Sequence, residues 1–329
     1  MLLKDTGNLR HRDCPGNGLA QNPTPCYAIV QAKPFGGPVP FPDIDPFIIG
    51  QIPAFELFGL TIGPLGVRWY ALAYVLGIIL GWRYALKLIR GESLWEPGKA
   101  PATGPQIDDL ILWLTLGIIG GGRLGYALFY SPDMFARPLD ILKLWDGGMS
   151  FHGGLAGVAI AIVWFCRANK LNLLSVGDVI AACAPIGLFF GRIANFINGE
   201  LWGRPTDLPW GVVFCNRTIE ATYGSCPAGG YSRHPSQLYE AALEGLFLFF
   251  LLRWSTHIAK ALPRPGFTTG LFLLGYGVVR MLLETVREPD AQMPEALRGM
   301  ITMGLLLSIP MVLIGGWLIW RSKPKGSAA

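Results

Sequence analysis

Apolar residues occur along the chain in long blocks separated by short polar segments. Seven blocks are long enough to cross about 30 Å of hydrocarbon, which takes about 20 helical residues each. They cover residues 67–89, 107–130, 149–168, 176–198, 235–254, 268–286 and 300–320. The stretch 47–62 is also apolar, but Pro53 and Gly59 interrupt it, so we expect an interfacial segment packed on the bundle. The pattern predicts an all-α integral membrane protein with about seven transmembrane helices and a small extracytoplasmic head region.

The composition agrees with a membrane protein. Of 329 residues, 51% are hydrophobic and 15% are charged, whereas charged residues make up about a quarter of an average soluble domain. The formal net charge of +5 does not indicate a nucleic-acid partner, because the basic residues form short clusters beside the apolar blocks. The six cysteines contain no CxxC pair, so we expect neither a metal site nor a cofactor.

The basic residues also predict the orientation, since cytoplasmic loops are enriched in Lys and Arg. They follow the first, third, fifth and seventh blocks, as Lys87, Arg90, Lys99, Arg167, Lys170, Arg253, Lys260, Arg264, Arg321, Lys323 and Lys325. We therefore expect the N-terminus and the 199–234 loop outside and the C-terminus in the cytoplasm. In that compartment Cys215 and Cys226 of the loop, and Cys14 and Cys26 of the tail, are able to form disulfides.

The expected domain division follows from these patterns. Residues 1–45 are polar and rich in Pro and Gly, and predict a flexible extracytoplasmic tail. Residues 46–321 form the transmembrane domain with its 199–234 loop, and 322–329 form a cytoplasmic tail. The tail carries basic residues, so either it crosses the membrane despite their charge or the true start lies further along the chain.

Gly117, Gly121 and Gly125 recur at four-residue spacing in the second block. This spacing places them on one face of a helix and lets a neighbouring helix approach closely. We interpret the stripe as packing and not as chemistry.

Arginine and glutamate occur inside the blocks, where a charge costs about 2.5–3.5 kcal/mol even on a lenient scale. Arg192 and Asn195 lie one turn apart near the end of the fourth block. Tyr276, Arg280 and Glu284 form one polar stripe in the sixth. An ion pair between Arg280 and Glu284 that only holds the bundle together is one interpretation. A phospholipid headgroup is the other, because guanidinium groups match phosphate oxygens.

The third block opens with the glycine-rich sequence GGMSFHGG around His152, which leaves room for a substrate. Imidazole changes its protonation near neutral pH, so this residue is the best candidate for a general base, with a bonded structural histidine as the alternative. Glu240 and Glu244 share a face at the start of the fifth block, where a helix dipole favours negative charge, and we assign them a supporting role. Tyr70 is interpreted first as part of an interfacial aromatic belt.

Three classes of function fit intramembrane arginines. A transporter or channel for an organic anion is disfavoured because the two halves of the chain show no internal repeat. A structural scaffold leaves unexplained why charge is concentrated at the outward ends of the third, fourth and sixth blocks. An enzyme that binds a phospholipid headgroup through these arginines is the third interpretation.

Four motifs resemble those of the bacterial phosphatidylglycerol:prolipoprotein diacylglyceryl transferases. They are WDGGMSFHGG over 145–154, GRIANFINGELWG over 191–203, RHPSQLYE over 233–240 and the segment 275–290, in the order of the family. The resemblance implies a multi-pass enzyme of the bacterial inner membrane. It implies transfer of the sn-1,2-diacylglyceryl group of phosphatidylglycerol to the lipobox cysteine of prolipoproteins, bound through their signal peptides. This forms a thioether and releases glycerol 1-phosphate, the first step of lipoprotein maturation.

The same resemblance assigns roles to residues of this chain. It implies that His152, Arg192 and Arg280 are catalytic. The positions implied to bind phosphatidylglycerol are Arg192, Arg280, Tyr70, Asn195, Glu200, Gly203, Tyr276 and Glu284.

Overall fold

The computed structural model describes residues 38–45, 47–53, 55–57, 60–62, 65–144, 147–288 and 302–322. The described residues all belong to one unit of the chain, Pro38–Ala329. Most of the predicted tail, with Cys14 and Cys26, therefore lies outside the described residues, as do Trp145 and Asp146 of the first motif. Of the predicted cytoplasmic tail only Ser322 is described.

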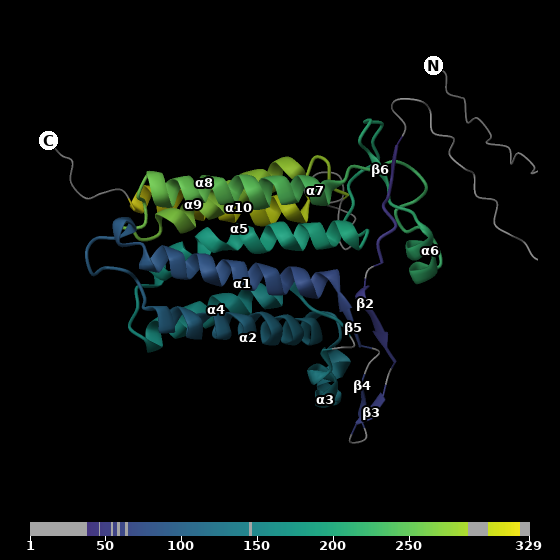
Figure 1. Ribbon diagram of the computed structural model, residues 1–329, viewed down its shortest axis with the longest axis horizontal. Coiled ribbons are helices and arrows are strands. Elements are labelled where there is room, and N and C mark those ends of the chain that lie inside the picture. The colour runs from purple at the N-terminus through teal and green to yellow at the C-terminus, as the bar shows by residue number, and fades with distance from the viewer. Residues whose placement is uncertain are drawn as a thin grey trace, which may run out of the picture. The chain divides into compact units, whose positions relative to one another are not determined.

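Within Pro38–Ala329 the long helices lie side by side and alternate in direction (Figure 1). They are α1 (Trp69–Arg90), α2 (Gly104–Phe129), α4 (Phe151–Ala168), α5 (Leu173–Ile197), α9 (Phe267–Leu283) and α10 (Met303–Arg321). Between α5 and α9 one unbroken helical run comprises α7 (Ser236–Glu240), the π-helical η4 (Ala241–Phe247), α8 (Leu248–Arg253) and the π-helical η5 (Trp254–Ile258). Each predicted apolar block thus coincides with one helix or helical run.

Five of the described helices are long and apolar enough to cross a membrane. They are Trp69–Arg90, Gly104–Phe129, Phe151–Ala168, Leu173–Ile197 and Gly304–Arg321. Helix α9 is apolar but shorter, and the run from Ser236 to Ile258 is divided by its π-helical segments. The bundle therefore has the length and composition of a membrane domain.

The fold is mostly helical, and the all-α prediction is corrected by six short strands among the described residues. They are β1 (Val39–Pro40), β2 (Phe47–Ile52), β3 (Phe55–Leu57), β4 (Leu60–Ile62), β5 (Leu65–Arg68) and β6 (Val212–Val213). Antiparallel pairs join β2 to β5 and β3 to β4, and a parallel pair joins β1 to β6. Within the apolar stretch 47–62, Pro53 separates β2 from β3, and each of these strands forms cross-strand hydrogen bonds with its partner.

Short helical pieces complete the connections. They are η1 (Glu92–Leu94), η2 (Pro132–Ala136), α3 (Pro138–Leu142) and α6 (Arg217–Tyr223). Figure 1 places α3, α6 and the strands at one end of the bundle, where α1 begins and α5 ends. This end carries the predicted site residues.

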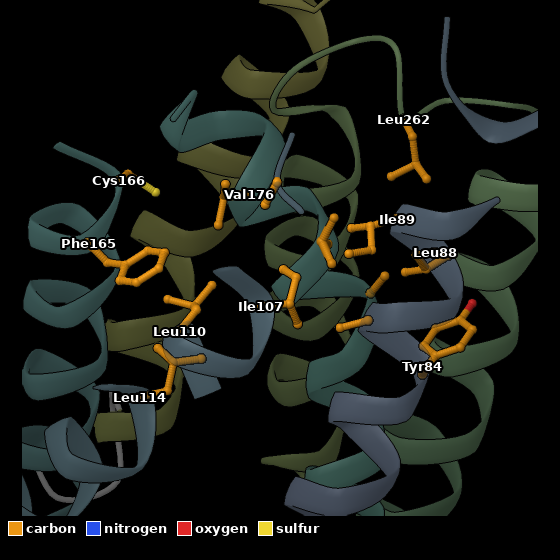
Figure 2. Close-up of a cluster of buried hydrophobic side chains, with 14 of the residues drawn as sticks. Tyr84, Leu88, Ile89, Ile107, Leu110, Leu114, Phe165, Cys166, Val176 and Leu262 are labelled. Carbon is orange, nitrogen blue, oxygen red and sulfur yellow. The ribbon is translucent and has the colours of Figure 1, made fainter. Parts of the chain in front are cut away.

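The main hydrophobic core lies toward the other end, where α1 ends and α2 begins (Figure 2). Leu88, Ile107 and Leu110 are fully buried there and pack with Phe165 of α4 and Val176 of α5. Between membrane-spanning helices such side chains stabilise the fold through close van der Waals packing. The core therefore fixes the helices at the end remote from the site residues.

The glycine stripe of α2 lies against α4, as its spacing predicted. A Cβ atom added at Gly117 would lie 2.6 Å from the carbonyl oxygen of Gly157, and one added at Gly125 would lie 2.7 Å from Gly153 Cα. A Cβ at Gly121 would overlap the same two α4 glycines. Helices α2 and α4 are thus in backbone contact along this seam.

A second, smaller core belongs to the segment 199–234. Phe41, beside β1, packs with Val212, Phe214 and Ile219 of this segment. The structure joins Cys215 to Cys226 by a disulfide with a Cα–Cα distance of 5.3 Å. The segment is therefore a folded element with its own apolar contacts.

Candidate active site

Arg192, near the end of α5, pairs with two glutamates of the neighbouring helical run. Its Nη1 lies 3.0 Å from Glu240 Oε2. Its Nη2 and Nε lie 3.0 and 3.1 Å from Glu244 Oε2. Both glutamates are 0% exposed. We expected a supporting role for both glutamates. They contact Arg192 directly and hold its guanidinium in place, because a buried charge without a partner is costly.

The π-helical segment η4 begins between these two glutamates, at Ala241. A Cβ atom added at Gly245 would lie 2.8 Å from Phe189 Cα, so η4 and α5 approach closely. π-Helical turns are rare and are often found at functional sites. Here the π segment lies where both carboxylates meet one guanidinium.

The ionic network continues from Glu240 to Arg287, just beyond α9. Glu240 Oε1 accepts a hydrogen bond from Arg287 Nη1 while Oε2 faces Arg192. The carbonyl of Arg287 accepts a bond of 2.8 Å from Arg204 Nε. One carboxylate therefore bridges two arginines and links the bundle to the segment 199–234.

A second ion pair lies on α9 and the residue that follows it. Arg280 Nη1 is 2.5 Å from Glu284 Oε2, and both side chains are largely buried. A Cβ atom added at Gly304 of α10 would overlap the Glu284 carboxylate and lie 2.8 Å from Arg280 Nη2. Tyr276 lies close enough to Arg280, Arg192 and Glu244 to interact with them electrostatically. The stripe read from the sequence therefore faces the Arg192 network.

Asn195 connects three other predicted residues. Its amide donates hydrogen bonds to Tyr70 Oη at 2.7 Å and to Glu200 Oε1 at 2.9 Å. The ring of Tyr70 packs on that of Tyr74, with centroids 5.3 Å apart. Tyr70 is therefore part of a polar contact set and not only of an aromatic belt. The sequence analysis did not single out Tyr74.

Gly203 lies between two backbone segments. Its N–H donates a hydrogen bond of 2.9 Å to the carbonyl of His234. A Cβ atom there would overlap Val286 O and lie 2.7 Å from His234 Cβ, so only glycine fits. Burial lowers the pKa of His234, which favours the neutral ring. Gly203 thus allows the close backbone approach to Arg287, with which it forms an antiparallel bridge, and its carbonyl accepts a hydrogen bond of 3.0 Å from Arg233 Nη1.

His152 is the second residue of α4 and is exposed. Its ring packs edge-on against Phe151, with centroids 5.6 Å apart, and it makes no hydrogen bond to any described residue. The helix start that carries it lies at the same end of the bundle as the end of α5 (Figure 1). His152 is therefore at the same end of the bundle as Arg192, and no contact joins it to Arg192 or Arg280.

The two sets of ion pairs are balanced in charge. Arg192, Arg280 and Arg287 are matched by Glu240, Glu244 and Glu284, so the group is formally neutral. Among the described residues, Glu244 Oε1 is buried and has no hydrogen-bond partner. An arriving anion must therefore share a guanidinium with one of these carboxylates, or a carboxylate must take up a proton.

An open apolar groove of about 470 Å³ runs beside this group, between the helical run of η4 and α8 and helix α9. It is lined by Leu243, Phe247, Leu274 and Val278 among other apolar residues. Leu243 and Val279 of its wall directly precede Glu244 and Arg280 in the chain. The groove therefore lies at the level of Glu244 and Arg280 along the two helices, while its own lining is apolar and contains neither side chain.

One group of potential metal ligands lies within the described part of the chain. The ligand atoms of Cys215, Glu220 and Cys226 are within 4.8 Å of one another. Both sulfur atoms belong to the disulfide, whereas a metal would need them as thiolates. In its disulfide form this group does not offer a metal centre.

The described features define a class, namely a mostly helical membrane protein with buried arginine–glutamate pairs at one end of its bundle. The chain belongs to the prolipoprotein diacylglyceryl transferase family, whose model matches residues 58–321. This confirms the family to which its four motifs pointed.

The matches between this chain and individual relatives cover nearly the whole length of each relative. A phosphatidylglycerol–prolipoprotein diacylglyceryl transferase of Phenylobacterium zucineum is 58% identical over 284 residues, which is 86% of this chain and 94% of the relative. One of Caulobacter vibrioides is 57% identical over 292 residues, with the same shares. One of Rhizobium meliloti is 50% identical over 293 residues, covering 88% of this chain and 96% of the relative.

Proposed function

We propose that this chain transfers the diacylglyceryl group of phosphatidylglycerol to the lipobox cysteine of a prolipoprotein. The reaction forms a thioether and releases glycerol 1-phosphate, as the first step of lipoprotein maturation. The observation that carries the proposal is the pair of buried arginines, Arg192 and Arg280, each held by carboxylates beside an apolar groove. The names of the relatives support the same reaction.

The arginines bind the phosphodiester and stabilise the charge that develops on the leaving group. The cysteine thiolate attacks the glyceryl methylene carbon, the carbon–oxygen bond to phosphate breaks, and its electron pair leaves with glycerol 1-phosphate. Guanidinium groups that Glu240, Glu244 and Glu284 already orient need little reorganisation as this charge forms. Their contribution is greatest in the transition state, which is where it accelerates the reaction.

A base must remove the proton of the thiol. A free cysteine has a pKa of about 8.5 and is therefore mostly protonated at neutral pH. We assign this step to His152, whose exposed ring at the start of α4 is open to an incoming peptide. Tyr70, Asn195, Glu200, Gly203 and Tyr276 surround the lipid headgroup in this proposal.

The apolar groove between η4–α8 and α9 takes an acyl chain of the lipid. Its lining is apolar throughout, so a hydrocarbon chain loses no hydrogen bond there. In this proposal the headgroup of the same lipid binds at Arg192 and Arg280.

The proposed topology has seven spans in the bacterial inner membrane, an external N-terminus and a cytoplasmic C-terminus. The domain boundaries are those expected from the sequence: a tail over 1–45, a catalytic domain over 46–321 and a cytoplasmic end over 322–329. Helix α9 and the run Ser236–Ile258 supply the two spans beyond the five long helices. The segment 199–234 is then an extracytoplasmic head that receives the signal peptide.

The test uses purified full-length protein with labelled phosphatidylglycerol and a lipobox peptide. We expect lipidation of the peptide and release of glycerol 1-phosphate in equal amounts. Absence of both products, from protein shown to be folded, would reject the proposed function.

A second measurement separates the roles of the residues. We expect Arg280→Ala and His152→Gln both to lose turnover, the first through loss of headgroup binding and the second through loss of the base. Near-normal turnover in His152→Gln alone would show that His152 is not the obligatory base.

A further inference from the structure

Arg123 is a buried arginine of α2 that has no carboxylate within ion-pair distance among the described residues. Its residue is 4% exposed, and it forms no ion pair with any described residue. A buried guanidinium needs compensation, since removing a charge from water is costly. For Arg123 this compensation comes from backbone carbonyl groups.

All five N–H donors of Arg123 are directed at backbone carbonyls of one segment. Guanidinium has five N–H groups in a fixed planar fork. They bond to the carbonyl oxygens of Ile141 (2.8 Å), Gly148 (3.0 Å), Asp140 (2.7 Å), Lys143 (2.8 Å) and Gly147. Every donor therefore has an acceptor within residues 140–148.

Three of these carbonyls lie at the C-terminal end of α3. The last carbonyls of a helix have no partner within it, and the helix dipole makes this end negative. Arg123 therefore donates hydrogen bonds to these carbonyls and also places a positive charge at the negative end of the short helix. The other two carbonyls, of Gly147 and Gly148, belong to the link that leads to α4.

The link is fixed to α2 at further points before it reaches His152. Gly148 has a φ of +81° and lies on the ring of Tyr126, where a Cβ atom would be only 2.5 Å from the ring. The N–H of Ser150 donates to the carbonyl of Gly122 at 2.9 Å, and its hydroxyl accepts from the N–H of Gly153 to cap α4. His152 lies within this cap.

We propose that Arg123 is a positioning residue that holds the α3–α4 link, and through it His152, in the geometry needed for transfer. The inference rests on the proposed function and on the role assigned to His152. Arg123 lies on the α2 side of the link and touches neither Arg192 nor Arg280. It acts on the reaction through the backbone that precedes His152.

Lysine cannot replace this arginine. Its ammonium group offers three donors from a single point, whereas the five carbonyls surround a planar fork. Arg123→Lys keeps the charge and leaves part of the link unbound. Arg137→Lys is the matched control, because Arg137 lies in the same region but has an exposed side chain that pairs with the Asp140 carboxylate at the surface.

Turnover and lipid affinity are measured separately in the full-length protein. We expect Arg123→Lys to lower kcat by about 10- to 100-fold, as small misplacements of catalytic groups do. The KM for phosphatidylglycerol should change less than about twofold, since the arginine pairs are intact. Arg137→Lys should behave as wild type. Unchanged kcat in Arg123→Lys, or a parallel rise in KM, overturns the proposal.

A readout independent of activity follows His152 itself. The rate of its carbethoxylation by diethyl pyrocarbonate is measured by peptide mass spectrometry in the folded protein. We expect this rate to change at least about threefold in Arg123→Lys, as a local displacement of the ring requires, while His234 reacts as in wild type. An unchanged rate at His152 overturns the proposal, and an equal change at both histidines shows general loosening and overturns it as well.

Gly148→Ala perturbs the same link without altering Arg123, and it provides the test should Arg123→Lys fail to fold. Its Cβ is strained at positive φ and meets Tyr126, so we expect the same loss of kcat and the same change at His152. Wild-type protein without transfer activity would instead reject the proposed function. Normal turnover in His152→Gln would show that His152 is not needed for transfer, and it would therefore overturn the proposal that Arg123 positions it.

Discussion

The carboxylate of Asp178, on α5, accepts hydrogen bonds from both the backbone N–H and the hydroxyl of Thr269 at the start of α9. The distances are 2.7 and 2.8 Å, and the N–H of Gly266 adds a third bond of 2.7 Å to the other carboxylate oxygen. Asp178 is fully buried. A side chain from one helix thus caps the N-terminus of another, where the helix dipole favours a negative charge.

Asp178→Asn should therefore destabilise the protein. The amide keeps one acceptor oxygen but turns an N–H₂ group toward donors, which costs about 1–3 kcal/mol and lowers Tm by several degrees. Thermal unfolding in detergent measures the change. Asp109→Asn, at an exposed position of α2, is the control and should leave Tm unchanged. Equal Tm values for the two variants would contradict the assigned cap.

Glu244→Gln should strengthen the response of the protein to anionic lipid. The variant keeps the shape of the side chain but leaves the Arg192 network with an excess positive charge. Without lipid we expect the free energy of unfolding to fall by about 1–3 kcal/mol, and Tm to fall with it. On adding phosphatidylglycerol we expect Tm to rise more than in wild type. Glu96→Gln, at an exposed pair, should match wild type in both measurements. A lipid-induced rise no larger than that of wild type would show that charge balance does not limit headgroup binding.

Two adjacent glycines of α2 should respond oppositely to alanine. A Cβ at Gly121 overlaps the α4 backbone, whereas one at Gly120 meets nothing within 4 Å. We expect Gly121→Ala to lose about 1–3 kcal/mol through overpacking, and Gly120→Ala to be neutral or slightly stabilised by better helix propensity. Thermal unfolding measures the Tm of each variant relative to wild type. Similar Tm values would mean that the close approach of α2 and α4 adds nothing to stability.

The disulfide between Cys215 and Cys226 should be visible in a thiol count. Denatured wild type and the double variant Cys215→Ser, Cys226→Ser should show equal numbers of free thiols without reductant. With reductant, wild type should gain two thiols relative to the variant. A wild-type count that reductant leaves unchanged would contradict the pairing.

The positions of the helices were predictable because each apolar block has about the 20 residues that a helix needs to cross a membrane. The strands in 47–62 were not predicted as strands, since Pro53 and Gly59 indicate an interruption but not what replaces the helix. The π-helical turn at Ala241 was not predictable either, because apolar periodicity does not distinguish it from an α-turn within a few residues.

The candidate site was partly predictable. The cost of charge in a span pointed to Arg192 and Arg280, and the four-residue spacing pointed to the pair Arg280–Glu284, which is present. The partners of Arg192 lie on another helix, so no local spacing links them to it. Arg123 was not predicted although it is also an arginine in an apolar block. Its partners are backbone carbonyl groups, which every residue carries and which leave no pattern in the sequence.

The backbone contact between α2 and α4 has a mechanical consequence. Two helices that touch at Gly117, Gly121 and Gly125 have little room to slide or tilt against each other, and they move as one body. His152 is on this body, and Arg192 is on α5. A displacement of the α2–α4 pair relative to α5 would therefore change the distance between histidine and arginine without any change in the contacts between α2 and α4.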